Sequence, residues 1–139
     1  MLGIGGGGDV VGALAAVRRC EELDTPARLG GVAWERLPID PRPGPRSVEE
    51  IVGGRRLGDR AVLADHETTT IDGIPFSESH VAKHLGSETV LIDITGGSAG
   101  AAAGIAAAAA TLGCDLVLLV DIGGDAIAGG HEPGLASPL

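Results

Sequence analysis

Aromatic side chains are almost absent from this chain of 139 residues, which holds one tryptophan, one phenylalanine and no tyrosine. Trp34 and Phe76 cannot fill a hydrophobic core by themselves, so small and branched aliphatic residues must do so. Apolar residues make up 44% of the sequence, which is enough for one domain with a core of its own. Such an aliphatic composition is typical of strands that are buried on both faces between helices.

Basic residues are also scarce, because ten Lys and Arg stand against nineteen Asp and Glu and the formal net charge is −9. A domain of this charge repels a polyphosphate backbone at long range, so we expect no nucleic-acid partner. A small phosphate ligand is still possible, since backbone N–H groups can bind it locally.

Cysteine is limited to Cys20 and Cys114, which form no CxxC pair and which we interpret as small buried apolar residues. His80 and His84 are one helical turn apart but have no obvious third ligand, so zinc is disfavoured.

The longest apolar stretch, 101–120, is mostly alanine and is interrupted by Asp115, which indicates a helix and a strand rather than a membrane span. Without a signal-peptide pattern after Met1, we expect a cytoplasmic protein and no membrane partner.

The apolar pattern predicts alternating strands and helices. Strands are expected at 1–4, 27–34, 90–94 and 115–120, the last being the strongest, and helices at 9–23, 77–85 and 98–112. Between them, 37–46 is too proline-rich for a helix or a central strand, Ser47 and Glu50 favour a short capped helical turn, and 61–64 is predicted to form a hairpin with 67–71.

This order of elements predicts an α/β fold, namely a Rossmann-like three-layer α/β/α arrangement with a mostly parallel sheet. We expect a single domain over residues 1–139, in which 37–76 forms an irregular insertion with a small β-hairpin and a Pro-rich loop.

A glycine-rich turn between the first strand and the first helix has the GxGxxG spacing of dinucleotide-binding folds, with Gly3, Gly5, Gly6, Gly7 and Gly8. Glycine permits tight turns and close approach of a ligand, and the N–H groups of the following helix can bind phosphate. A tight turn without a ligand is the alternative, because a run of four glycines matches the spacing easily. Asp9 stands where an anion would bind, and is expected to cap the helix or to hold a metal or a ligand hydroxyl.

Glu35 follows the second strand, where an acidic residue commonly binds ribose hydroxyls. The spacing from the glycines is somewhat long, so a surface carboxylate beside Arg36 is the alternative.

The third and fourth strands end in similar polar segments, which comprise Asp93, Thr95, Gly96, Gly97, Ser98, Asp121, Gly123, Gly124 and Asp125. Because ligands of open α/β sheets bind outside the carboxyl ends of the strands, we expect these segments to converge on one crevice. Asp93, Asp121 and Asp125 are candidate catalytic bases, Mg²⁺ ligands or acceptors for sugar hydroxyls, or they cap the following helices. His131, Glu132 and Ser137 either close over the site or belong to an ordinary tail.

Four segments resemble the DUF1152 family, a group of archaeal and bacterial proteins without an assigned activity: GIGGGGDVVGAL (3–14), GGVAWERLPIDPRPGPR (30–46), VLIDITGG (90–97) and DLVLLVDIGGDAIAGGHEPGLASPL (115–139). The resemblance implies a Rossmann-like fold. Family members begin with a longer first strand and continue past the SPL segment, so it also implies that this chain is their N-terminal half. Such a half would expose apolar edges and need a partner copy.

The favoured hypothesis is a domain that binds a nucleotide or a phosphorylated metabolite, within an enzyme that uses the strand-end carboxylates. The alternative is a module that binds a small-molecule ligand without catalysis, or an oligomerising domain whose alanine-rich helix packs against another copy. NAD(P) and Mg²⁺ are candidate cofactors, but the spacing of Glu35 and the presence of Asp9 count against NAD(P).

Overall fold

The computed structural model describes residues 1–37, 39–123 and 133. The helices are α1 (Asp9–Glu22), α2 (Ser77–Leu85) and α3 (Gly97–Leu112), with a short 3-10 helix η1 (Val48–Glu50). The strands are β1 (Leu2–Gly3), β2 (Gly30–Val32), β3 (Trp34–Glu35), β4 (Gly44–Pro45), β5 (Ile51–Val52), β6 (Arg55–Gly58), β7 (Ala61–Ala64), β8 (Thr69–Thr70), β9 (Thr89–Ile92) and β10 (Leu119–Val120).

Six strands form one sheet in the order β10-β1-β2-β9-β7-β6. The first four strands are parallel to one another, whereas β7 runs antiparallel to both β9 and β6. Two antiparallel pairs, β3–β4 and β5–β8, lie outside this sheet. The predicted α/β class and the mostly parallel sheet are therefore confirmed.

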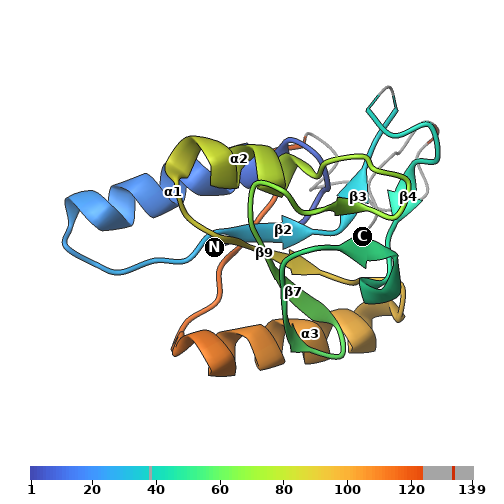
Figure 1. Ribbon diagram of the computed structural model, residues 1–139. Helices are drawn as coiled ribbons and strands as arrows, with labels where there is room; N and C mark the ends of the chain where they lie inside the picture. The colour runs from blue at the N-terminus through green and yellow to red at the C-terminus, as the bar shows by residue number, and fades with distance from the viewer. Residues whose placement is uncertain (38, 124–132, 134–139) are drawn as a thin grey trace.

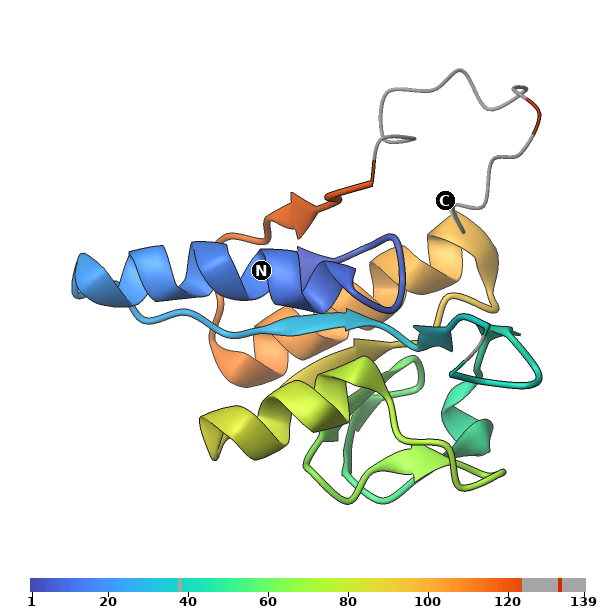
Figure 2. The ribbon, with the colours of Figure 1, turned by 90° about the horizontal axis from the view of Figure 1, so that it is seen from above.

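The helices lie on both faces of the sheet. In Figure 1, α1 and α2 lie above the strands and α3 lies below them. Figure 2 shows α1 beside the β1 and β10 edge, while α2 lies over the region of β9 and β7, as their contacts also show. Since β1 leads into α1 and β9 leads into α3, both helices begin at the carboxyl end of the parallel strands.

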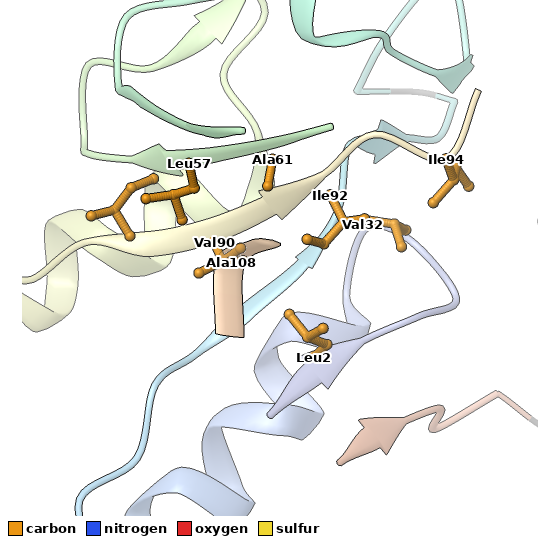
Figure 3. Close-up of a cluster of buried hydrophobic side chains, with 9 residues drawn as sticks. Leu2, Val32, Leu57, Ala61, Val90, Ile92, Ile94 and Ala108 are labelled. Atoms are coloured by element: carbon orange, nitrogen blue, oxygen red, sulfur yellow. The ribbon is translucent and has the colours of Figure 1, made fainter. Parts of the chain in front are cut away.

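The core is aliphatic, as the composition predicts. Figure 3 shows the main cluster, which consists of Leu2, Val32, Leu57, Ala61, Leu63, Val90, Ile92, Ile94 and Ala108. On the side of α1 and α2, Val10, Ala13 and Val17 pack with Leu29 and Val81. The single phenylalanine, Phe76, is fully buried among smaller side chains just before α2.

Most local signals have the predicted effect. Gly86 and Gly113 end α2 and α3 in the left-handed conformation, with φ of 62° and 66°. The capping box of Ser47 and Glu50 is present in η1 and confirms the short turn expected there. All three helices lie within one residue of their predicted bounds.

The predicted hairpin between 61–64 and 67–71 is wrong. β7 pairs with β6, which the sequence analysis missed, and β8 pairs with β5 instead. The reason is that β6 is an edge strand with the sequence RRLG, in which only Leu57 is buried, so it carries no recognisable apolar alternation.

The predicted strength of the last strand is also wrong. Only Leu119 and Val120 form β10, and the run before them leaves Leu116 and Leu118 exposed at 72% and 42%. Within the part of the chain that the structure describes, this strand lies at the sheet edge and pairs only with the two residues of β1, so its apolar run lacks described neighbours that would bury it.

The cysteines depart from their predicted burial. Cys20 and Cys114 are both half-buried, and both are free thiols. Among the residues that the structure describes, no helix is long and apolar enough to cross a membrane.

Candidate functional site

The parallel pairing brings four strand ends to one edge of the sheet. The turn 3–8 follows β1, Glu35 lies just beyond β2, the turn 93–98 follows β9, and Asp121 follows β10. Gly124, Asp125, His131, Glu132 and Ser137 lie outside the described residues. The candidate site is built from the remaining side chains and turns at this edge.

Two N–H groups of the first glycine-rich turn already have acceptors within the protein. Gly5 donates its N–H to Oδ2 of Asp9 over 2.7 Å, and Gly7 donates to the carbonyl oxygen of Trp34 over 3.1 Å. The guanidinium of Arg36 donates to the carbonyl oxygen of Gly5 over 2.7 Å, so this turn is fixed from both sides.

Asp9 does not cap α1, contrary to the prediction. Gly8 is the N-cap residue and Asp9 is the first residue of the helix, with its carboxylate directed back to Gly5. Burial raises the pKa of the Asp9 carboxyl and the charge of Asp121 raises it further, whereas the Gly5 N–H and Arg36 lower it. A phosphate at this turn would therefore compete with a carboxylate for the same N–H donor.

Glu35 is buried at 1% exposure, which contradicts the alternative of a surface carboxylate. Its Oε1 accepts the N–H of Ser77 in the first turn of α2, and its Oε2 lies 4.0 Å from the position that a Cβ on Gly7 would take. Burial raises the pKa of Glu35, although hydrogen bonds from Ser77 act in the opposite direction. This carboxyl group thus connects the glycine-rich turn to α2.

The proline-rich loop is held by a buried ion pair that the sequence analysis did not identify. Arg46 and Asp40 form an ion pair in which the two side chains are only 2% and 1% exposed. The guanidinium of Arg46 also lies 3.5 Å from a carboxylate oxygen of Glu50 and from one of Asp72. The backbone N–H of Arg46 donates to the carbonyl oxygen of Ala33, one residue beyond β2. The loop is therefore fastened beside the strand end that carries Glu35.

Asp93 is buried and is saturated by hydrogen-bond donors. Its Oδ1 accepts the N–H and the hydroxyl of Thr95 at 2.7 and 2.6 Å. Its Oδ2 accepts the N–H of Val48 at 3.3 Å and the guanidinium of Arg60 at 3.1 Å. The carboxylate fixes the turn before α3 relative to η1 and the β6–β7 hairpin.

Arg60 is the residue of the site that sequence reasoning missed. It comes from the turn between β6 and β7, and its guanidinium donates to the Thr95 hydroxyl over 3.0 Å. The Cζ atom lies 3.0 Å from the position that a Cβ on Gly96 would take, so the guanidinium lies over the turn that begins α3. Arg60 is distant from Thr95 in sequence and lies beside a strand without an apolar pattern, so no sequence signal connected it to this turn.

The beginnings of α1 and α3 have different electrostatic surroundings. The first turn of α3 contains no acidic residue and has beside it Arg60, which pairs with Asp93. A helix start carries partial positive charge and N–H groups without helical acceptors, although the N–H of Gly97 donates to the carbonyl oxygen of Ile94. At α1, Asp9 is close enough to Asp121 for the two charges to interact. Asp121 itself accepts the N–H of Gly123 over 2.7 Å.

Metal ligation has no support among the described residues, in which no group of three or more His, Cys, Asp or Glu side chains could hold an ion. Asp125, another predicted ligand, lies outside the described residues. The described site therefore offers a turn at α3 with an arginine beside it and a pair of carboxylates near α1.

These features define a mixed α/β protein whose glycine-rich turns meet at the carboxyl ends of its parallel strands. Residues 1–139 match the family model described as protein of unknown function (DUF1152), and the chain belongs to this family. The resemblance noted in the sequence is thereby confirmed. No curated protein and no solved structure is matched by the chain.

Proposed function

We propose that this DUF1152 chain is a Rossmann-like domain that binds a nucleotide or a phosphorylated metabolite at the carboxyl edge of its sheet. The single observation that carries the proposal is the guanidinium of Arg60 beside the acid-free first turn of α3. A positive side chain next to a helix N-terminus favours an anion, because both place positive charge at the same point. The positions of α1 and α3 on opposite faces of the parallel strands support the three-layer description.

The phosphate group is assigned to the turn formed by Thr95, Gly96, Gly97 and Ser98 rather than to the turn 3–8. Both turns have an arginine beside them, but the first turn of α3 contains no acidic residue, whereas at the turn 3–8 the carboxylate of Asp9 accepts the N–H of Gly5. The net charge of −9 makes a nucleic acid an unfavourable partner and leaves a small anion as the ligand.

The remaining part of the ligand is assigned to Asp9, Asp121 and Gly123. Carboxylates accept hydrogen bonds from sugar hydroxyls, so these residues suit a ribose or a related polyol. In the enzymatic form of the proposal, Asp121 and Asp125 act as general base or Mg²⁺ ligands. Asp93 suits that role less well, because its four hydrogen bonds leave it little free acceptor capacity.

Thermal denaturation of the purified chain with nucleoside phosphates, dinucleotides, sugar phosphates and inorganic phosphate tests the proposal. A ligand at about 100 times its Kd adds about 2.7 kcal/mol of stability, which raises Tm by several degrees. Arg60→Gln removes a charge-assisted contact worth about 1.5–3 kcal/mol, so the affinity should fall about ten- to a hundredfold.

Arg55→Gln is the matched control, because Arg55 is an exposed arginine of β6 and its substitution changes the net charge equally. Equal loss of affinity in both variants, or no stabilisation of the wild type by any phosphate compound, contradicts the proposal. Turnover of the bound compound would distinguish an enzyme from a binding module.

The chemical character of α3 favours a second candidate, an oligomerising module. The helix carries no charged residue, yet only Gly104 and Ala108 on it are buried, and a helix that is apolar all round is normally covered. Sedimentation velocity of the wild type and of Ala106→Glu tests this, since Ala106 is exposed. A monomer in both samples would reject the oligomer, whereas a wild-type dimer that the substitution dissociates would support it.

A cytoplasmic location remains part of the proposal. Its support is the presence of two free thiols, Cys20 and Cys114, which a reducing compartment preserves.

A further inference from the structure

Glu78 is a buried carboxyl group that the proposed ligand site does not use. It lies in the first turn of α2 at 1% exposure, and its Oε2 atom has no hydrogen-bond partner in the described part of the chain. Its Oε1 atom lies 1.9 Å from the position that a Cβ on Gly31 would take, so the absence of a side chain on β2 makes room for it. An ionised carboxylate without a partner is very unfavourable in such a place, whereas a neutral carboxyl group is tolerated.

The surroundings of Glu78 contain one charged group that acts on it, namely Glu35. The side chains that α1 contributes next to α2 are apolar (Val10, Ala13, Val17), and so are those from β7 and β9 (Val62, Ala64, Leu91). Thr89 of β9 donates its hydroxyl to the backbone carbonyl of Glu78 and not to the carboxyl group. Around Glu35, the charge of His80 lowers the pKa of that carboxyl and the charge of Asp40 raises it.

Burial raises the pKa of Glu78 well above its ordinary value of 4.5, the hydrogen bond from its own backbone N–H lowers it, and the negative charge of Glu35 raises it again. Burial is the largest of these effects, and it acts in the same direction as the missing hydrogen bond at Oε2. The geometry and the electrostatics therefore favour a neutral Glu78 whenever α2 is packed on β2.

Glu78 is also mechanically connected to the glycine-rich turn. The preceding residue, Ser77, donates its N–H to Glu35, and the other carboxylate oxygen of Glu35 lies near Gly7. Trp34, the neighbour of Glu35, accepts the N–H of Gly7 through its carbonyl oxygen. A displacement of the first turn of α2 would therefore also shift residues 3–8.

We propose that Glu78 is a proton-controlled latch that holds the first turn of α2 on β2 and thereby sets the position of Glu35 beside the glycine-rich turn. With Glu78 neutral, its Oε1 remains packed on Gly31 and the N–H of Ser77 stays bonded to Glu35. On loss of the proton, the two carboxylates repel each other and Glu78 requires water, so the first turn of α2 moves away from β2. This latch does not depend on which ligand the site binds.

The sign of the pH dependence follows from the raised pKa. The stability that Glu78 contributes is fully present below about 4.5, its ordinary value in the unfolded chain, and is lost as pH rises through the higher value of the folded chain. The free energy of unfolding of the full chain should therefore decline with pH in this window. In Glu78→Gln, which cannot ionise, this decline should be smaller, and what remains should come from groups such as Asp9 and Glu35, whose pKa values are also raised. The protection of amides 77–81 against hydrogen exchange, corrected for the intrinsic rise of exchange with pH, should no longer fall at the upper end of this pH window.

Direct observation of the carboxyl carbon tests the raised pKa separately from stability. In wild-type protein labelled with ¹³C at the glutamate carboxyl carbons, the signal of Glu78, assigned by its loss in Glu78→Gln, should titrate well above the ordinary value of 4.5. Glu35→Gln should move this titration to lower pH. Glu88→Gln is the control and should leave it unchanged. All glutamate signals titrating near 4.5, or parallel stability curves for the wild type and Glu78→Gln, would overturn the latch.

Discussion

The guanidinium of Arg60 lies directly over Gly96, with its Cζ atom 3.0 Å from the place that a Cβ on Gly96 would occupy. The contact involves the far end of a flexible side chain and not the backbone, so a methyl group could displace it at little cost. Gly96 has a negative φ of −81°, which an alanine also adopts. A methyl group at Gly96 should therefore change the position of the guanidinium with little effect on the stability of the fold.

Gly96→Ala should lower the affinity for a phosphate ligand with little change in Tm, because it moves Arg60 away from the first turn of α3. Gly8→Ala is the matched control at the other turn, since a Cβ on Gly8 meets nothing within 4 Å and the residue is already in the helical region. Isothermal titration of both variants measures the difference. A larger loss of affinity in Gly8→Ala than in Gly96→Ala would place the phosphate at α1 instead.

Gly31→Ala should be strongly destabilising, because its Cβ would overlap the Oε1 atom of Glu78. Overpacking of this kind typically costs about 1–3 kcal/mol. In the double variant with Glu78→Ala the overlap is gone, so the two substitutions should cost less together than the sum of their separate effects. Urea denaturation of the four proteins gives this coupling, and simple additivity would show that the two residues do not interact as the structure indicates.

The sequence predicts well those parts of the fold that short-range chemistry determines. The helix ended by Gly86 and the turn capped by Ser47 are in place because their signals lie within a few residues of one another. The partner of β7 could not be predicted, because register depends on which distant strand buries a given face. The place of Arg60 in the site could not be predicted for the same reason, because it is the folded hairpin that brings this residue to Gly96. Glu35 and Asp9 were identified as site residues, but their hydrogen bonds to Ser77 and Gly5 follow from packing.

Asp93→Asn should destabilise the protein even though it is nearly isosteric. An asparagine places an NH₂ group where a carboxylate oxygen now accepts hydrogen bonds, either from Thr95 or from Val48 and Arg60. An unsatisfied donor pair of this kind costs about 1–3 kcal/mol. Chemical denaturation measures the loss, and an unchanged stability would free Asp93 for the catalytic role that its bonding now disfavours.

Arg46→Met should be among the most damaging single substitutions in the chain. It leaves Asp40 buried without its cation, and breaking such a pair typically costs about 3–5 kcal/mol. Arg18→Met is the control, because Arg18 and Glu21 form an ion pair with both side chains about half exposed and should cost about 0.5 kcal/mol or less. Similar losses in the two variants would show that the buried pair does not hold the proline-rich loop.

Asp9→Asn should weaken the pH dependence of stability on the acidic side of neutrality. The pKa of Asp9 is raised above its ordinary 3.8, chiefly by burial, so its contribution to stability is present below that value and is lost as pH rises through the folded-state value. An asparagine still accepts the N–H of Gly5 through its carbonyl oxygen and cannot ionise. The difference in unfolding free energy between wild type and variant should therefore shift in favour of the variant as pH rises from 3.8.

Asp121→Asn should produce part of the same shift, because it removes the charge that opposes ionisation of Asp9. The difference in unfolding free energy between wild type and Asp9→Asn could instead stay constant over this range. Asp9 would then ionise as it does in the unfolded chain, and the turn 3–8 would have to be reconsidered as a site for a cation.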